Sequence, residues 1–210
     1  MTDNRLNLSM KWLFLFFVTI LCGCSIHFDN FTIHKNWSTP VSKVPANLVV
    51  IANENLCSFT VTEKRSGDKL IFHVGQTICE NAQDVFSLAF RRVQVVRNSN
   101  DVVEKNADFM VYMKIIDASV VSRSGIPVAI DSVVNLEWTL TDMDGKLLYV
   151  NTVNGVGQDV RTFGTLPTRQ QASMEMCLND LMRKLYEDML TPAVRQIANS
   201  LSRTGGTTRP

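Results

Sequence analysis

One stretch of this 210-residue chain alternates apolar and polar side chains without interruption. Every second residue from Val134 to Leu140 is apolar, and the residues between them are asparagine, glutamate and threonine. Successive side chains of a β-strand point to opposite faces of its sheet, so the pattern predicts a strand with one buried and one wet face. The turn residues Asp142–Gly145 follow, and residues 146–153 are expected to return as the partner strand of a hairpin. The rest of the chain must then cover one face of an antiparallel sheet.

Two segments have the apolar spacing of helices that pack one side against a sheet. The first runs from Gln76 to Arg92, and the second from about Thr168 to Leu190, with a shorter helix from Pro192 to about Ser202. Further strands are expected at residues 48–51, 56–62, 69–74 and 93–96, and a longer one from residue 109. These elements predict an α+β fold, a mainly antiparallel sheet with two helical segments packed on one face.

The segment before residue 25 has the build of a bacterial export signal. Lys11 precedes an apolar run over residues 12–21, which is shorter than the roughly twenty residues that span a bilayer. The run ends in Leu21-Cys22-Gly23-Cys24, which resembles the lipobox of bacterial lipoproteins, although Cys22 departs from the residue types usual there. The resemblance implies that residues 1–23 are removed, that Cys24 is acylated, and that Ser25 directs the product to the outer membrane. A plain signal peptide or a buried apolar helix remains the alternative.

The domain organisation follows from these segments. Residues 1–23 are expected to be the signal peptide, 24–45 the lipidated N-terminus and a tether, 46–202 a single α+β domain, and 203–210 a disordered tail. The tether has aromatic side chains at Phe28, Phe31 and Trp37 that could lie against the domain. The whole chain has a net charge of +1 and the chain without residues 1–23 is balanced, which argues against a nucleic-acid partner.

Three cysteines remain in the expected domain: Cys57, Cys79 and Cys177. The apolar face of the strand predicted at 56–62 includes Cys57, and Cys79 lies near the start of the first helix, so both point toward one core. The periplasm is oxidising, and a Cys57–Cys79 disulfide is therefore plausible. Three buried thiols acting as small apolar groups are the alternative. The spacing lacks a CxxC pair, which argues against a metal site.

No motif in the chain predicts catalysis or a cofactor. His73 lies on an expected strand without an obvious nucleophile, so a strand residue at a sheet edge is favoured over a catalytic base. The segment Asp142–Gly145 has only part of a calcium loop, and a hairpin turn explains it better. The pair Gly155 and Gly157 lacks the third glycine of a dinucleotide site and is expected in a bulge or loop. We therefore expect a protein that is not an enzyme.

The expected function is that of an accessory or adaptor lipoprotein on the periplasmic side of the outer membrane. Such a protein would contact the membrane through its lipid and would bind another envelope protein. Two surfaces could bind this partner. One is an unpaired strand edge, and the other is the side of the long helix that has Met182, Tyr186 and Leu190. Core packing is the simpler interpretation of that helix side. A periplasmic carrier of lipid or a small ligand is the alternative function, and a hydrolase is disfavoured.

Overall fold

The structure is a computed structural model, and it describes residues 25–37, 42–64, 69–101, 107–123, 125 and 127–204. The elements in chain order are β1 Ser25–Phe28, β2 Val44–Ile51, α2 Glu54–Cys57, β3 Val61–Lys64, β4 Lys69–Phe72, α3 Val74–Ala89, β5 Phe90–Val96, a 3₁₀ turn at Ser99–Asp101, β6 Phe109–Arg123, β7 Ala129–Thr141, β8 Leu147–Asp159, α4 Leu166–Met189 and α5 Pro192–Thr204.

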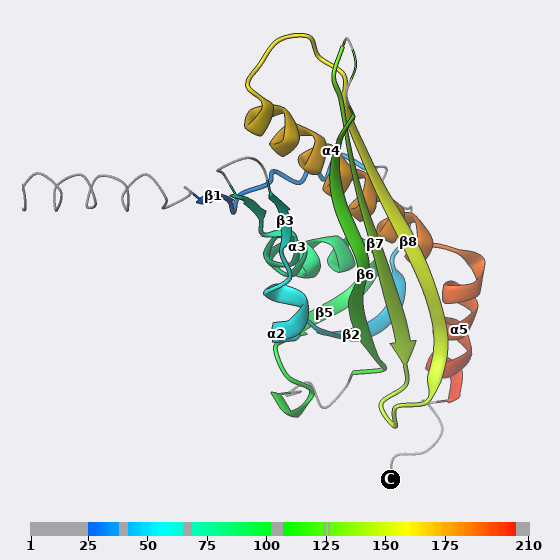
Figure 1. Ribbon diagram of the computed structural model, residues 1–210. Helices are drawn as coiled ribbons and strands as arrows, with labels where there is room; N and C mark the ends of the chain where they lie inside the picture. The colour runs from blue at the N-terminus through cyan, green and yellow to red at the C-terminus, as the bar shows by residue number, and fades with distance from the viewer. Residues whose placement is uncertain are drawn as a thin grey trace, which may run out of the picture.

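The main sheet has the strand order β5-β2-β6-β7-β8. Its β6, β7 and β8 form long antiparallel hairpins, whereas β2 runs parallel to both β5 and β6. Figure 1 shows the hairpins as a long curved ribbon with α4 lying along it. The two long helices and α5 contribute to one continuous apolar core with this sheet. The predicted α+β class is confirmed, and the sheet is mixed because the α3 connection returns β5 parallel to β2.

The buried face of β7 matches the alternation in the sequence. Val134, Leu136, Trp138 and Leu140 have no exposed surface. The indole nitrogen of Trp138 also donates a hydrogen bond of 2.7 Å to Asp188 on α4. The hairpin turn at Gly145, where φ is +83°, returns the chain into β8 as predicted.

A second, smaller sheet has the order β1-β4-β3. In it β1 runs parallel to β4, so the residues directly after Cys24 lie on the folded domain. The described residues that follow β1 also pack on the domain. Phe31 is buried, and the ring of Trp37 stacks on Tyr186 of the last long helix, with centroids 5.6 Å apart. The aromatic residues of the expected tether therefore contact the core. Within the described residues no helix has the length and apolarity needed to cross a membrane.

Three expected local structures are wrong. The strand predicted over residues 69–74 ends at Phe72, and His73 is the N-cap residue of α3 instead of a strand residue. The strand predicted over residues 56–62 is the short helix α2 followed by β3, because the side chain of Asn53 caps α2 by accepting a hydrogen bond from the Leu56 amide. The loop predicted after residue 153 is the second half of β8. There α4 packs so closely that a Cβ on Gly157 would lie 1.9 Å from the Ser173 carbonyl oxygen. Gly155 and Gly157 occupy the strand because only a residue without a side chain leaves room for the backbone of α4.

Candidate functional site

A strand edge becomes open in the middle of the main sheet. The pairing of β2 with β6 covers only Leu48–Ile51 against Phe109–Tyr112. After Ile51 the chain leaves the sheet and turns into α2, while β6 continues for eleven more residues. No described strand pairs with that side of β6 beyond Tyr112. The backbone of β6 directly after Tyr112 therefore presents an edge to which an extended segment can bond, whereas β3 also lies against β6.

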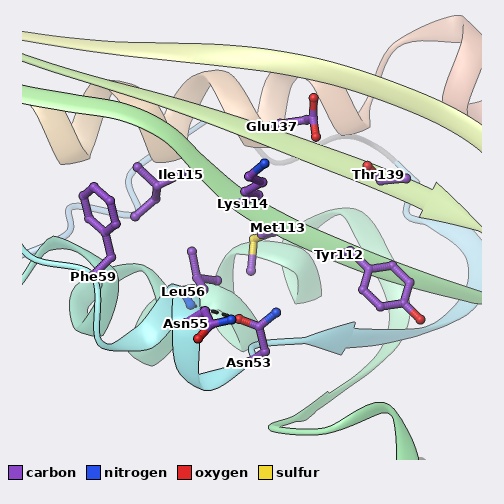
Figure 2. Close-up of a pocket in the computed structure, with 10 residues that line it drawn as sticks. All are labelled: Asn53, Asn55, Leu56, Phe59, Tyr112, Met113, Lys114, Ile115, Glu137 and Thr139. Carbon is purple, nitrogen blue, oxygen red and sulfur yellow. Dashed lines mark hydrogen bonds between the residues drawn. The ribbon is translucent and has the colours of Figure 1, made fainter.

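A cleft of about 420 Å³ lies at this edge, and we call it the edge cleft. Its volume falls within the range of small-ligand pockets. Figure 2 shows α2 and Phe59 on one side, with the strands β6 and β7 on the other. The residues that line it are Asn53, Asn55, Leu56, Phe59, Tyr112, Met113, Lys114, Ile115, Glu137 and Thr139.

The α2 wall of the edge cleft is fixed to α3 at three points. A disulfide joins Cys57 and Cys79, with Cα atoms 5.6 Å apart. The amide of Gly75 donates a 3.0 Å hydrogen bond to the Phe59 carbonyl. A Cβ on Gly75 would lie only 1.8 Å from the Leu56 carbonyl oxygen, so α2 and α3 touch backbone to backbone. A wall held in this way is preorganised, which lowers the entropic cost of binding.

The lining combines an apolar floor with recognition groups at the rim. Leu56, Met113 and Ile115 are buried, whereas Asn55 and Lys114 are exposed. Strand addition uses backbone hydrogen bonds for affinity and side-chain pockets for specificity, and the edge cleft offers both. The lining contains no serine, cysteine or histidine. The ionisable groups of the lining are Tyr112, Lys114 and Glu137.

The helix surface expected as a partner site lies in the core. Met182 has no exposed surface, Tyr186 is 2% exposed, and Leu190 is partly buried against the same core. The expectation is corrected because the segment before β2 covers this side of α4, with Trp37 stacked on Tyr186. Burial raises the pKa of the Tyr186 hydroxyl. The simpler interpretation, core packing, is the one that the structure shows.

The remaining predicted residues are placed as follows. Cys24, the expected lipidation site, lies outside the described residues. Cys57 and Cys79, expected as a pair, are bonded, and Cys177 is a buried free thiol. Burial raises the pKa of the Cys177 thiol to about 12, so it stays protonated and unreactive near neutral pH. The carboxylate of Asp142 accepts amide hydrogens of its own turn at Asp144 and Lys146, as a hairpin turn requires.

Two acidic groups, the half-buried Asp188 and the buried Asp159, serve the fold. Asp188 accepts hydrogen bonds from Trp138, Tyr149 and Asn151, and it joins α4 to both strands of the β7–β8 hairpin. Burial, and next the hydrogen bond to Asp188, raise the pKa of Tyr149. At the end of β8, the buried carboxylate of Asp159 is paired with the guanidinium groups of Arg161 and Arg169. Both oxygens of each carboxylate accept hydrogen bonds from neighbouring groups of the fold.

Sequence reasoning missed the edge cleft because its walls come from distant segments. Phe59 was assigned to a strand, and Asn53 and Asn55 fell between two predicted strands. Nothing in the pattern shows that β2 ends before β6 does. One signal was available: Asn53 directly after an apolar strand, followed by Glu54, is a typical helix N-terminus. Reading it would have placed α2, although not the edge beside it.

No family model and no curated protein matches this sequence. Among solved structures, protein XCC0632 from Xanthomonas campestris, of the family DUF330, aligns with a TM-score of 0.54 at 12% identity, over 84% of this chain and 98% of that chain. That similarity shows the fold alone. A minor lipoprotein from Acinetobacter baumannii aligns at 0.40, with 12% identity over 76% of this chain and 95% of that one. The PelC dodecamer from Paraburkholderia phytofirmans aligns at 0.35, with 15% identity over 69% and 95%. These two scores are too low to add an argument.

Proposed function

We propose that this chain is an accessory lipoprotein of the bacterial envelope, anchored in the outer membrane through Cys24. It binds an extended segment of another envelope protein at the edge cleft and catalyses no reaction. The observation that supports this is the open edge of β6 beside a wall fixed by the Cys57–Cys79 disulfide. The anchor is inferred from the Leu21–Cys24 motif.

The lining also argues for a peptide as the occupant. Met113 and Ile115 belong to the open edge itself, so a bound segment would lie where a continuation of β2 would have run. Asn53 and Asn55 offer amide groups that can both donate and accept hydrogen bonds. The exposed Lys114 and the half-buried Glu137 supply charges of opposite sign at the rim, which favour a partner segment with mixed polarity.

The alternative of a ligand cavity between sheet and helices has less support. A Cβ on Gly155 would lie 2.5 Å from the Cys177 carbonyl oxygen, so α4 lies directly on β8. The side chains between them, including Met174 and Leu178, have no exposed surface. A lipid chain would have to displace this packing, and native cores hold few voids of that size.

The binding claim is tested by photo-crosslinking in cells. Benzoylphenylalanine is placed at Asn55, which is exposed at the rim of the edge cleft, and in a matched chain at Gln196, which is exposed on α5. We expect a discrete protein adduct from position 55 that is absent from position 196. An adduct with lipid alone would favour the carrier, and equal labelling of many proteins from both positions would contradict a specific site.

The anchor is tested separately by palmitate labelling. Cys24→Ser should abolish labelling and leave an unprocessed precursor, because the thioether needs that sulfur. Cys22→Ser, a matched change two residues away, should still be labelled. Undiminished labelling of the Cys24→Ser chain would contradict the assignment.

A further inference from the structure

Two histidines and an aspartate converge where β1 meets the start of α3. Nδ1 of His27 lies 3.1 Å from Nε2 of His73, and the same Nε2 lies 3.2 Å from Oδ1 of Asp29. All three donor atoms lie within 4.8 Å of one another. We propose that His27, Asp29 and His73 form a binding site for a divalent transition metal ion, with Zn²⁺ as the best fit.

The distances suit a shared cation. Around a tetrahedral Zn²⁺ with bonds of about 2.0–2.1 Å, the ligand atoms lie about 3.3 Å from each other. The two measured separations are close to that value. Imidazole nitrogen and carboxylate oxygen are both ordinary zinc ligands, and three protein ligands leave a fourth position for water or for a group of a partner.

Hydrogen bonds among these three atoms cannot all be well aligned. Nε2 of His73 holds at most one hydrogen and lies near both Nδ1 of His27, which donates or accepts according to its tautomer, and the acceptor Oδ1 of Asp29. One N–H can donate a well-aligned bond to only one of them. A cation placed among the three atoms accepts a lone pair from each. The cluster is also half exposed, with 28% of the His73 side chain and 51% of the Asp29 side chain open to solvent, so an ion can enter.

The backbone holds the three residues in place without the ion. His27 pairs with Ile71 in the parallel β1–β4 ladder, and the His73 amide donates a 3.0 Å bond to the Phe28 carbonyl. His73 is the N-cap residue of α3, and its ring makes no cap hydrogen bond, so the imidazole is available. These contacts bring two segments that are 46 residues apart into one site.

Metal binding would fasten β1 to the domain. This strand has only four residues, and an isolated pair of such short strands is weak. His27 lies three positions after Cys24, so under the proposed anchoring the ion would hold the domain close to the membrane. Release of residues 25–30 would add about 20 Å of extended chain. This consequence rests on the proposed function, whereas the metal site does not.

The test is zinc titration of the full chain, purified in detergent with a tag free of histidine and stripped of metal with a chelator. We expect one Zn²⁺ per chain by calorimetry, and at least about tenfold weaker binding in His27→Ala, Asp29→Asn and His73→Ala. His34→Ala is the matched control, because His34 is the third histidine and lies outside the cluster. It should bind as the wild type does.

A second measurement, the shift of Tm with Zn²⁺, keeps the proposal testable if one of the variants folds poorly. Because an ion that binds the native state raises stability, Zn²⁺ should raise the Tm of the wild type and of His34→Ala. It should leave the Tm of His27→Ala unchanged, and His27 is exposed on a peripheral strand, so that variant is expected to fold. No saturable binding by the wild type, or equal binding by His27→Ala, would overturn the site. Neither result depends on Cys24 or on the edge cleft.

Discussion

At the scale of single residues, Trp138 combines apolar burial with a specific hydrogen bond. Its side chain has no exposed surface, and its indole nitrogen donates to Asp188. The strand pattern in the sequence predicts the burial, because Trp138 shares a period of two with apolar neighbours. It does not predict the bond, since Asp188 comes from a helix 50 residues away.

Trp138→Ala should lower the free energy of unfolding by about 3–5 kcal/mol, through lost burial and the cavity left behind. Trp138→Phe should cost less, because most of the apolar volume is retained. Thr152→Ala, at an exposed position of β8, is the control and should change little. Urea unfolding measures all three variants. An unchanged midpoint for Trp138→Ala would contradict the burial of this ring.

Gly157 is required because the backbone of α4 occupies the place of a side chain. A Cβ there would lie 1.9 Å from the Ser173 carbonyl oxygen and 2.5 Å from the Cys177 amide nitrogen. We expect Gly157→Ala to lower the Tm strongly, since the helix must move away from the sheet. Gly125→Ala is the matched change, because its Cβ would meet only the Pro127 carbonyl oxygen at 3.5 Å. A similar Tm for the two variants would contradict the close approach.

At the scale of elements, sequence patterns predicted the long helix and the long strands. They failed at the short helix and at the point where one strand ends. The buried stripe of α4 and the alternation of β7 were predictable because each repeats its period over several turns or residues. The short helix α2 was not, because four residues are too few to show a helical period. The second half of β8 was missed because its glycines, which leave room for the backbone of α4, are a residue type that is typical of loops.

The Cys57–Cys79 disulfide joins α2 to α3 across 22 residues of sequence. Replacing both cysteines with alanine should lower the free energy of unfolding by about 3 kcal/mol, because the unfolded chain gains freedom. A reductant should destabilise the wild type by a similar amount and leave the double variant unchanged. Equal sensitivity of the two proteins to the reductant would show that this bridge contributes nothing.

The junction of β8 and α4 depends on pH through Asp159. Burial opposes its charge, but hydrogen bonds from Arg161 and Arg169 outweigh burial and hold its pKa below the ordinary 3.8. A carboxyl whose pKa is lower in the folded state stabilises the fold above about pH 4 and loses that effect as the pH falls through the lowered value. Asp159→Asn should therefore be less stable than the wild type at pH 7.

The difference between the Asp159→Asn variant and the wild type should begin to shrink near pH 4, where the unfolded wild-type chain binds a proton at this group. It should disappear as the pH falls through the lowered pKa of the folded state. Urea midpoints measured between pH 7 and pH 3 give this difference directly. Asp144→Asn, in the exposed hairpin turn, should track the wild type throughout. A difference for Asp159→Asn that is constant with pH would contradict the ionised state of this group.

At the scale of the whole molecule, the proposed metal site and the edge cleft are neighbours, because Gly75, two residues after His73, touches the backbone of Leu56 and Phe59 in the cleft wall. The β1 end, directly after Cys24, holds the His27, Asp29 and His73 cluster and is expected to face the membrane. The edge cleft lies between α2 and the strands β6 and β7 (Figure 2). The fold class predicted from the sequence is confirmed, whereas the lipid anchor stays a prediction. The sequence also offered a strand edge as one of two binding surfaces. The burial of Met182 and Tyr186 leaves that edge as the better surface.

Hydrogen exchange tests the binding claim most directly, by comparing the chain alone with the chain bound to the protein captured from position 55. Amides at an open edge exchange readily, and strand addition protects them. The account predicts slower exchange in the bound chain at residues 113–115 and across residues 53–59, with no change in α5. Protection confined to β8 or α5, with residues 113–115 unchanged, would contradict it.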